Sequence, residues 1–225
     1  MRLLGSWFNV NKRNPCSYKY VVENITESTQ PNLADPDDAI LDGFAKSLLT
    51  AHADPDMIRE ECKILLEQLD FLELNIIKGY IEQKILPAKA AGIKGLARIG
   101  NFGEVLASQI LMNFQGFSIP IYKLRYREKQ SWAMKLTDLC LINKDESLAK
   151  PLVCYGEVKT KSTKYDANLG VAGHDSLVKD DALEDPEILK FFCTILYNRQ
   201  EYDKANFFSR LRLNKFEYDK KYHFF

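Results

Sequence analysis

The first residue that suggests chemistry is an aspartate inside an apolar segment. Asp138 lies within residues 136–142, LTDLCLI, a run apolar enough to predict a buried strand. A buried carboxylate without a partner is costly and tends to stay protonated. We therefore expect a cation beside Asp138. The alternative is an ordinary aspartate at the end of a strand or in a structural salt bridge.

Two further charged residues lie in the next predicted strand. Glu157 and Lys159 are two positions apart, so their side chains point to the same face of a strand, with Val158 on the other. A Glu-x-Lys pair alone is a weak signal, because it usually marks a solvated strand face. Here the neighbouring residues look internal, and Asp138 belongs to the preceding strand of the same predicted hairpin. Neighbouring strands can bring Asp138 and Glu157 within reach of one ion.

Glu104 is the third candidate carboxylate, in the first turn of a predicted helix and at the border of its apolar face. An acidic residue there also stabilises a helix through its dipole, so a structural role is the alternative. Together Glu104, Asp138 and Glu157 form an oxygen-rich set that suits Mg²⁺ or Mn²⁺ and not zinc. Such an ion polarises a phosphodiester and lowers the pKa of bound water. Lys159 can orient that water or stabilise the charge that develops on the phosphate.

Composition indicates the class of protein that carries these residues. The chain has 225 residues, 46% apolar and 28% charged, as in a globular protein. Its 31 basic and 31 acidic residues cancel, which argues against a polybasic nucleic-acid binder but leaves a local basic groove open. No segment predicts a signal peptide or a membrane span. Five scattered cysteines fit reduced thiols in a cytoplasmic protein, and three distant histidines make no zinc motif.

Residues 1–90 are predicted to form a mainly helical N-terminal region after an irregular start. Asp35 and Asp54 each precede a proline, the pattern of a helix N-cap followed by its first residue. A third helical stripe follows and ends before Pro87.

Residues 91–225 are predicted to form an α/β core around the candidate residues. The predicted elements begin with a Gly- and Ala-rich turn at 88–100, a helix at 102–114 that stops at Gly116, and a β-prone segment at 118–127. Strands at 135–143 and 152–160 follow and pair as an antiparallel hairpin. A polar loop after Thr163 then leads to a helix that opens at Asp185-Pro186 and to a further helix at 202–213.

The chain's last residues, KYHFF at 221–225, read as the first half of a strand with no turn after it. We expect either a C-terminally truncated chain or a terminal edge strand. The expected fold is α/β, with a small mixed central sheet flanked by helices and preceded by the helical region.

The order helix-Glu, strand-Asp, strand-Glu-x-Lys resembles the catalytic core of the PD-(D/E)XK nucleases, the restriction-endonuclease-like superfamily. More closely, GNFGEVLASQIL, KLRYREKQSWAMKLTDLCLI and YGEVKTKST are similar to the HamA-type effector nuclease of the Hachiman antiviral defence system. This similarity covers roughly residues 99–161. A threonine stands before Asp138 in place of the proline that gives the motif its name, and that proline is commonly missing in this superfamily.

The resemblance implies a role for each candidate residue. Asp138 and Glu157 would ligate the metal, with the main-chain carbonyl of Val158 and the carboxylate of Glu104 as further candidate ligands. Lys159 would be the catalytic lysine. The resemblance also implies a DNA substrate and a superfamily-two helicase partner (HamB-like) that holds the nuclease in check and delivers DNA.

Basic residues around the site are candidates for contact with the DNA backbone. A lysine-rich loop is also commonly just solvated, and no base-reading motif is evident, so little sequence specificity is expected. Two other functions stay open: a non-catalytic scaffold of nuclease fold that binds a helicase or nucleic acid, and an RNA-cleaving enzyme with the same site. The sequence gives no indication of ion count, oligomeric state or activating signal. The candidate contact residues are Lys123, Arg125, Arg127, Lys161 and Lys164.

Overall fold

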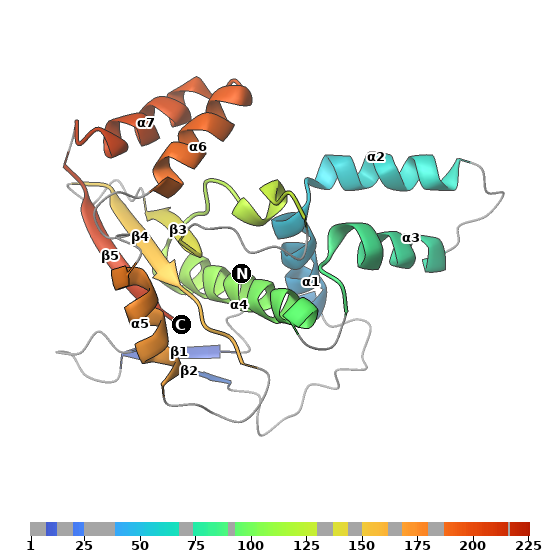
Figure 1. The fold of residues 1–225 in the computed structure, drawn as a ribbon, viewed down its shortest axis with the longest axis horizontal. Helices are drawn as coiled ribbons and strands as arrows, with labels where there is room; N and C mark the ends of the chain where they lie inside the picture. Colours follow the sequence, from blue (N-terminus) through green and yellow to red (C-terminus); the bar gives the residue numbers. More distant parts are fainter. Residues whose placement is uncertain are drawn as a thin grey trace.

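Helices and a small mixed sheet form an α/β arrangement (Figure 1). No helix of the described part is long and apolar enough to cross a membrane. The fold is taken from a computed structural model, which describes residues 8–12, 20–24, 39–67, 74–89, 93–129, 137–143, 150–161, 168–179, 187–215 and 217–225.

The central sheet has three strands in the order β3-β4-β5. β3 (Leu139–Asn143) and β4 (Leu152–Glu157) are antiparallel, and β4 is parallel to β5 (Asp219–Phe224). β4 is therefore the middle strand and is hydrogen-bonded along both edges. The expected hairpin and mixed sheet are confirmed, and the end of the chain forms a strand. A separate antiparallel hairpin joins β1 (Phe8–Lys12) and β2 (Tyr20–Asn24).

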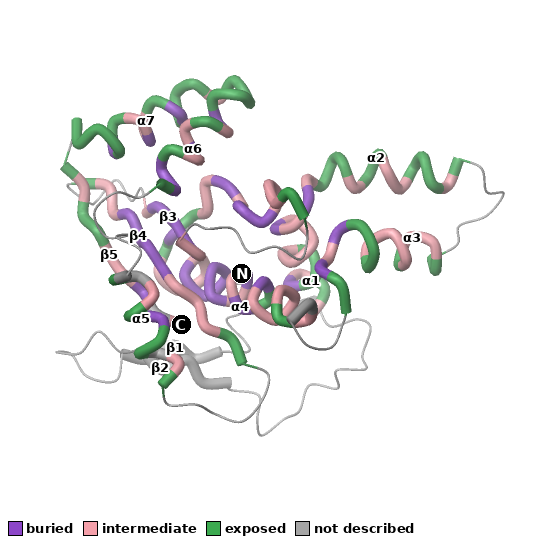
Figure 2. Tube along the Cα trace, viewed as in Figure 1, coloured by how far each residue is buried: buried purple, intermediate pink, exposed green. Residues whose placement is uncertain are grey.

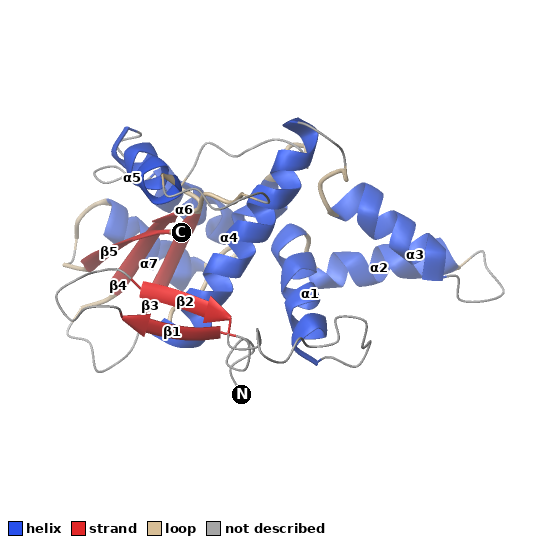
Figure 3. Ribbon diagram, turned by 90° about the horizontal axis from the view of Figure 1, so that it is seen from below, coloured by secondary structure: helices blue, strands red, loops and turns tan. Residues whose placement is uncertain are grey.

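Helices lie on both faces of the central sheet. Seen from below, α4 runs between the sheet and α1, while α2 and α3 extend away from the rest of the chain (Figure 3). The described α-helices are α1 (Ala39–His52), α2 (Pro55–Leu66), α3 (Leu74–Tyr80), α4 (Ile93–Gln115), α5 (Leu169–Lys179), α6 (Glu187–Asn198) and α7 (Tyr202–Arg212).

Alternation of side chains along β3 and β4 divides the core into two layers. One face of the sheet packs against α6 and α7 in a buried cluster that contains Cys140, Ile142, Val153, Tyr155, Ile188, Leu189, Phe192, Leu196, Ala205, Phe208 and Leu211. The other face packs against α4 through Leu139, Leu141, Cys154, Ala107, Leu111 and Phe117. The start of β3 and the end of β4 are thus held between two helical layers.

The N-terminal helices are attached through α1. Its residues Phe44 and Ala51 are buried with Val105 of α4 and Leu124. α2 begins as predicted, because the carboxylate of Asp54 caps the N–H of Asp56, 3.0 Å away, and Pro55 takes the first position. Neither α2 nor α3, both described in full, contains a buried residue (Figure 2).

Four predictions of secondary structure are wrong. The irregular start contains the β1–β2 hairpin, and α4 begins at Ile93 because its packing outweighs the low helix propensity of glycine. The β-prone segment 118–127 contributes one isolated bridge, between Ser118 and Ile142, and then a 3₁₀ turn at Lys123–Tyr126. The predicted loop after Thr163 includes α5, which packs against β4 and β5.

Candidate active site

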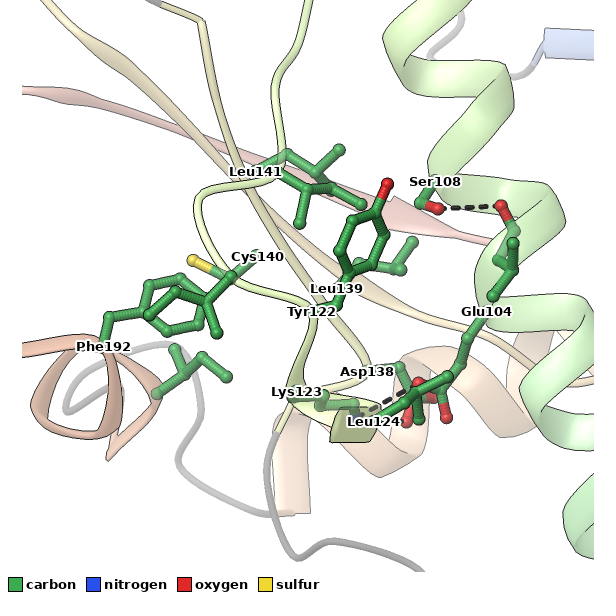
Figure 4. Close-up of a pocket in the computed structure, with 14 residues that line it drawn as sticks. Glu104, Ser108, Tyr122, Lys123, Leu124, Asp138, Leu139, Cys140, Leu141 and Phe192 are labelled. Carbon is green, nitrogen blue, oxygen red and sulfur yellow. Dashed lines mark hydrogen bonds and ion pairs between the residues drawn. The ribbon is translucent and has the colours of Figure 1, made fainter. Parts of the chain in front are cut away.

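Asp138 immediately precedes β3 and bonds to groups from two other elements. Its Oδ1 lies 3.2 Å from Nζ of Lys123, and its Oδ2 accepts a hydrogen bond of 3.0 Å from the main-chain N–H of Val158. Nζ of Lys123 also donates to the carbonyl of Thr137 at 3.1 Å and lies 3.6 Å from Oε2 of Glu104. The cation beside Asp138 is Lys123, and this ion pair agrees both with the expected cationic partner and with the alternative of a structural salt bridge (Figure 4).

Glu104 reaches the same cation from α4. Its side chain is 13% exposed, and its Oε1 lies 3.8 Å from Nη2 of Arg127. The pKa of Glu104 is raised to about 7, chiefly by burial; the charges of Lys123 and Arg127 lower it and the charge of Asp138 raises it, and about 7 is the net value. The carboxyl group of Glu104 therefore exchanges its proton near neutral pH when no metal is bound.

Glu157 and Lys159 form a second group at the end of β4. Oε1 of Glu157 accepts a hydrogen bond of 2.7 Å from Nζ of Lys159, as expected for side chains on one strand face. The same Nζ lies 3.4 Å from the hydroxyl of Ser176 on α5. The Lys159 side chain is 33% exposed, so its ammonium group is held in place but remains accessible to solvent.

The backbone of the Glu157-Val158-Lys159 segment is fixed from both sides. On one side, the N–H of Val158 bonds to the carboxylate of Asp138. On the other, the N–H of Phe225 donates to the carbonyl of Glu157 at 3.0 Å, and the N–H of Lys159 donates to the carbonyl of Phe225 at 2.8 Å. These bonds extend the β4–β5 pairing past the end of both strands and orient the Glu-x-Lys segment.

The register brings Asp138 and Glu157 to neighbouring positions, but their carboxylates have different partners. Leu139 pairs with Gly156 at the end of the β3–β4 ladder, so Asp138 and Glu157 occupy the next facing positions. Asp138 shares a cation with Glu104, whereas Glu157 pairs with Lys159. Among the described residues, no three His, Cys, Asp or Glu side chains are grouped as a metal site.

A comparison of the sequence with models of known protein families identifies one family. Residues 24–215 match the sequence model of the HamA family. The chain belongs to the HamA family. Searches of curated proteins and of solved structures returned no match. The matched region contains Glu104, Asp138, Glu157 and Lys159. The family is also the one that the sequence motifs resemble. Membership of this family makes the chain a candidate component of Hachiman defence.

Three of the five basic residues expected to contact DNA point into this HamA-family chain. Lys123 bonds to the site carboxylates and Arg127 lies against Glu104. Nε of Arg125 donates to the carbonyl of Thr50 at 2.6 Å, and its Nη1 bonds to Asp54 at 3.2 Å. Contact with DNA stays a prediction for them, and their positions show an internal role that the sequence did not indicate. Lys161 is exposed, and Lys164 lies outside the described residues.

Two further residues that shape the site escaped the sequence reading. A Cβ added to Gly103 would lie 1.7 Å from Oγ1 of Thr160 and 2.9 Å from its Cβ, so glycine allows α4 to approach the segment that follows β4. Ser176 contacts Lys159 from α5. The Gly103-Glu104 pair in the sequence was a signal for Gly103. Ser176 gave no such signal, because it lies in a segment that was predicted to be a loop.

The donor atoms at this site suit a hard divalent cation. Glu104 and Asp138 both approach one positive charge, the ammonium group of Lys123, so the position already favours a cation. Magnesium commonly takes only one or two protein carboxylates and completes its shell with water and phosphate oxygens. The chemistry of the carboxylates therefore fits Mg²⁺ or Mn²⁺, although lysine side chains hold them in this arrangement.

Proposed function

We propose that this HamA-family protein is a metal-dependent nuclease that hydrolyses DNA phosphodiester bonds as the effector of a Hachiman antiviral defence system. One observation carries the proposal: two largely buried carboxylates, from α4 and from the start of β3, meet one cation beside a Glu-x-Lys segment that is fixed by its backbone. The order of these residues is that of the restriction-endonuclease-like core, which we propose as the fold of residues 91–225, after a helical N-terminal region at 1–90.

In this proposal each charged residue has a distinct role. Asp138 and Glu157 hold Mg²⁺ or Mn²⁺, with the carbonyl of Val158 and the carboxylate of Glu104 as further ligands. When bound, such an ion would supply Lewis-acid chemistry at the phosphodiester and would lower the pKa of a bound water. Lys159 is partly exposed and has fixed partners, which suits a group that donates hydrogen bonds to a phosphate oxygen or to the attacking water.

The expected surroundings of this reaction follow from the family. We propose that the protein acts in the cytoplasm, without a membrane, beside a HamB-like superfamily-two helicase that restrains it and delivers DNA. Exposed Lys161 is the best-placed of the predicted phosphate contacts among the described residues. Metal chemistry at the phosphate would act on RNA as well, so the choice of DNA must be measured.

A second candidate is a non-catalytic scaffold that binds a helicase or nucleic acid. The observation in its favour is that Lys123 and Lys159 already neutralise the site carboxylates without a metal. Such internal ion pairs would also stabilise a protein that keeps the nuclease fold but has lost catalytic activity.

One experiment separates the two candidates. The purified chain, alone and with its helicase, is incubated with plasmid, linear duplex, single-stranded DNA and RNA in Mg²⁺, Mn²⁺ or chelator. We expect metal-dependent loss of DNA that falls at least about 100-fold in Glu157→Gln and in Lys159→Ala, as for the loss of a principal catalytic group.

The matched controls are Glu217→Gln and Lys150→Ala, which break an exposed ion pair away from the site. Both controls should cleave like the wild type, and circular dichroism should show that all four variants are folded. Absence of cleavage in every condition, with nucleic acid or helicase still bound, would establish the scaffold instead.

A further inference from the structure

Lys123 is, with Arg127, one of the two most buried charged side chains described at the site. It is 6% exposed and begins the short 3₁₀ turn that follows α4. Its ammonium group lies near three oxygen atoms from two segments: the carbonyl of Thr137 and Oδ1 of Asp138 just before β3, and Oε2 of Glu104 on α4, at 3.1, 3.2 and 3.6 Å. Oxygen atoms from separate elements converge on Lys123 as they would on a metal ion.

A divalent ion held by the same two carboxylates would occupy nearly the same position. Metal–oxygen distances for Mg²⁺ are about 2.1 Å, so an ion bound to Glu104 and Asp138 would lie between the oxygens that Lys123 now contacts. An ammonium group that stayed within a few ångströms of that ion would be repelled strongly in a poorly solvated site.

The charges of the cluster lead to the same conclusion. When ionised, Glu104 and Asp138 carry two negative charges, and Lys123 and Arg127 bring two positive charges against them. Adding a divalent ion with both cations in place would leave the buried cluster with an excess of two positive charges. Withdrawal of the Lys123 side chain removes one of them and frees two carboxylate oxygens.

We propose that Lys123 is a built-in competitor of the metal ion, a positioning residue that holds Glu104 and Asp138 in the metal-free protein and withdraws its ammonium group when the ion binds. This inference rests on the proposed metal-dependent function. It gives the site a threshold, because metal binding must replace the contacts of Lys123 with Asp138 and Glu104 before the carboxylates are available.

Calorimetry of Mn²⁺ binding without nucleic acid tests the competition directly. Lys123→Met keeps much of the length of the side chain and removes its charge, and we expect it to bind Mn²⁺ at least tenfold more tightly than the wild type. Lys123→Arg keeps the charge and should show no such gain. Arg125→Met removes a cation from the same turn that bonds to Thr50 and Asp54, and its affinity should match the wild type.

A second measurement uses the wild-type protein and does not depend on how well the variants fold. Lysine acetylation read by mass spectrometry should be low at Lys123 in chelator and rise severalfold with Mn²⁺. Exposed Lys150 should react equally in both conditions.

The outcomes separate this inference from the proposed function. Tighter binding in Lys123→Met, with Lys123 labelling that rises with Mn²⁺, supports the competition. Equal or weaker binding in Lys123→Met, with binding lost in Asp138→Asn, overturns the competition and leaves the metal site standing. No Mn²⁺ binding in either the wild type or Lys123→Met overturns both. If Lys123→Met does not fold, unchanged labelling of wild-type Lys123 in Mn²⁺-bound protein overturns the competition.

Discussion

Replacing Glu104 by glutamine should stabilise the metal-free protein, and only at neutral and alkaline pH. Burial raises the pKa of Glu104 from 4.5 to about 7, so the folded state binds a proton that the unfolded state has already released between these values. The stabilisation that comes from this proton is complete below pH 4.5 and is lost as the pH rises through 7. Glutamine has the shape of the protonated carboxyl and cannot ionise.

The size of the effect follows from the same shift. Each pKa unit corresponds to about 1.4 kcal/mol, so the ionised carboxylate costs the folded protein about 3 kcal/mol relative to the neutral group. The free energies of unfolding of Glu104→Gln and the wild type should differ by less than about 1 kcal/mol at pH 4.5. At pH 8.5 the variant should be more stable by about 3 kcal/mol.

Urea denaturation in chelator, at pH 4.5, 6.5 and 8.5, measures this difference. Exposed Glu128→Gln is the control, and its difference from the wild type should not grow with pH in this way. A Glu104→Gln variant that is less stable than the wild type at pH 8.5, or that differs by the same amount at every pH, would refute the reasoning. The first result would mean that the ion pairs with Lys123 and Arg127 outweigh the cost of burying the Glu104 carboxylate, and the second that they balance it.

Two further substitutions test how the site and the helices are held. Gly103→Ala should displace Thr160 and lower the free energy of unfolding by about 1–3 kcal/mol. Gly100→Ala is the control: a Cβ there meets nothing within 4 Å, so this variant should raise the free energy of unfolding by up to about 1 kcal/mol. Thermal denaturation of the two variants and the wild type measures the difference. Asp54→Ala should lower the free energy of unfolding by about 1–2 kcal/mol, because it removes both the N-cap of α2 and the partner of Arg125. Asp54→Asn should retain most of the cap and lose less stability. Equal losses of stability in the two variants would assign the whole effect to the ion pair with Arg125.

The sequence predicted those parts of the fold that depend on local signals. Asp54 and Pro55 start α2, Gly116 with a φ of 70° follows the end of α4, and the two apolar runs at 135–143 and 152–160 predict the hairpin. The N-terminal hairpin and α5 were missed because their local patterns are weak. α5 contains Gly170 and Gly173, and it packs against β4 and β5.

The candidate site was predicted as a set of residues, and its arrangement depends on distant contacts. Asp138, Glu157 and Lys159 could be selected because charged residues are unusual in apolar strands. The partner of Asp138 could not be selected, since nothing local distinguishes Lys123 from Arg125 or Lys129. Burial of Lys123 is favourable only because α4 and the start of β3 bring Glu104 and Asp138 to it.

The parallel pairing of β4 with β5 also determines when the site can form during protein synthesis. The ribosome makes β3 and β4 early, but Phe225, which bonds to the backbone of Glu157 and Lys159, is added only after α5, α6 and α7. A parallel pair depends on such distant contacts and therefore forms slowly. A nascent chain that already carries Glu157 and Lys159 thus lacks the two bonds with which Phe225 orients their backbone. For a protein whose proposed reaction would damage the DNA of its own cell, this order of synthesis delays assembly of the site until β5 has left the ribosome.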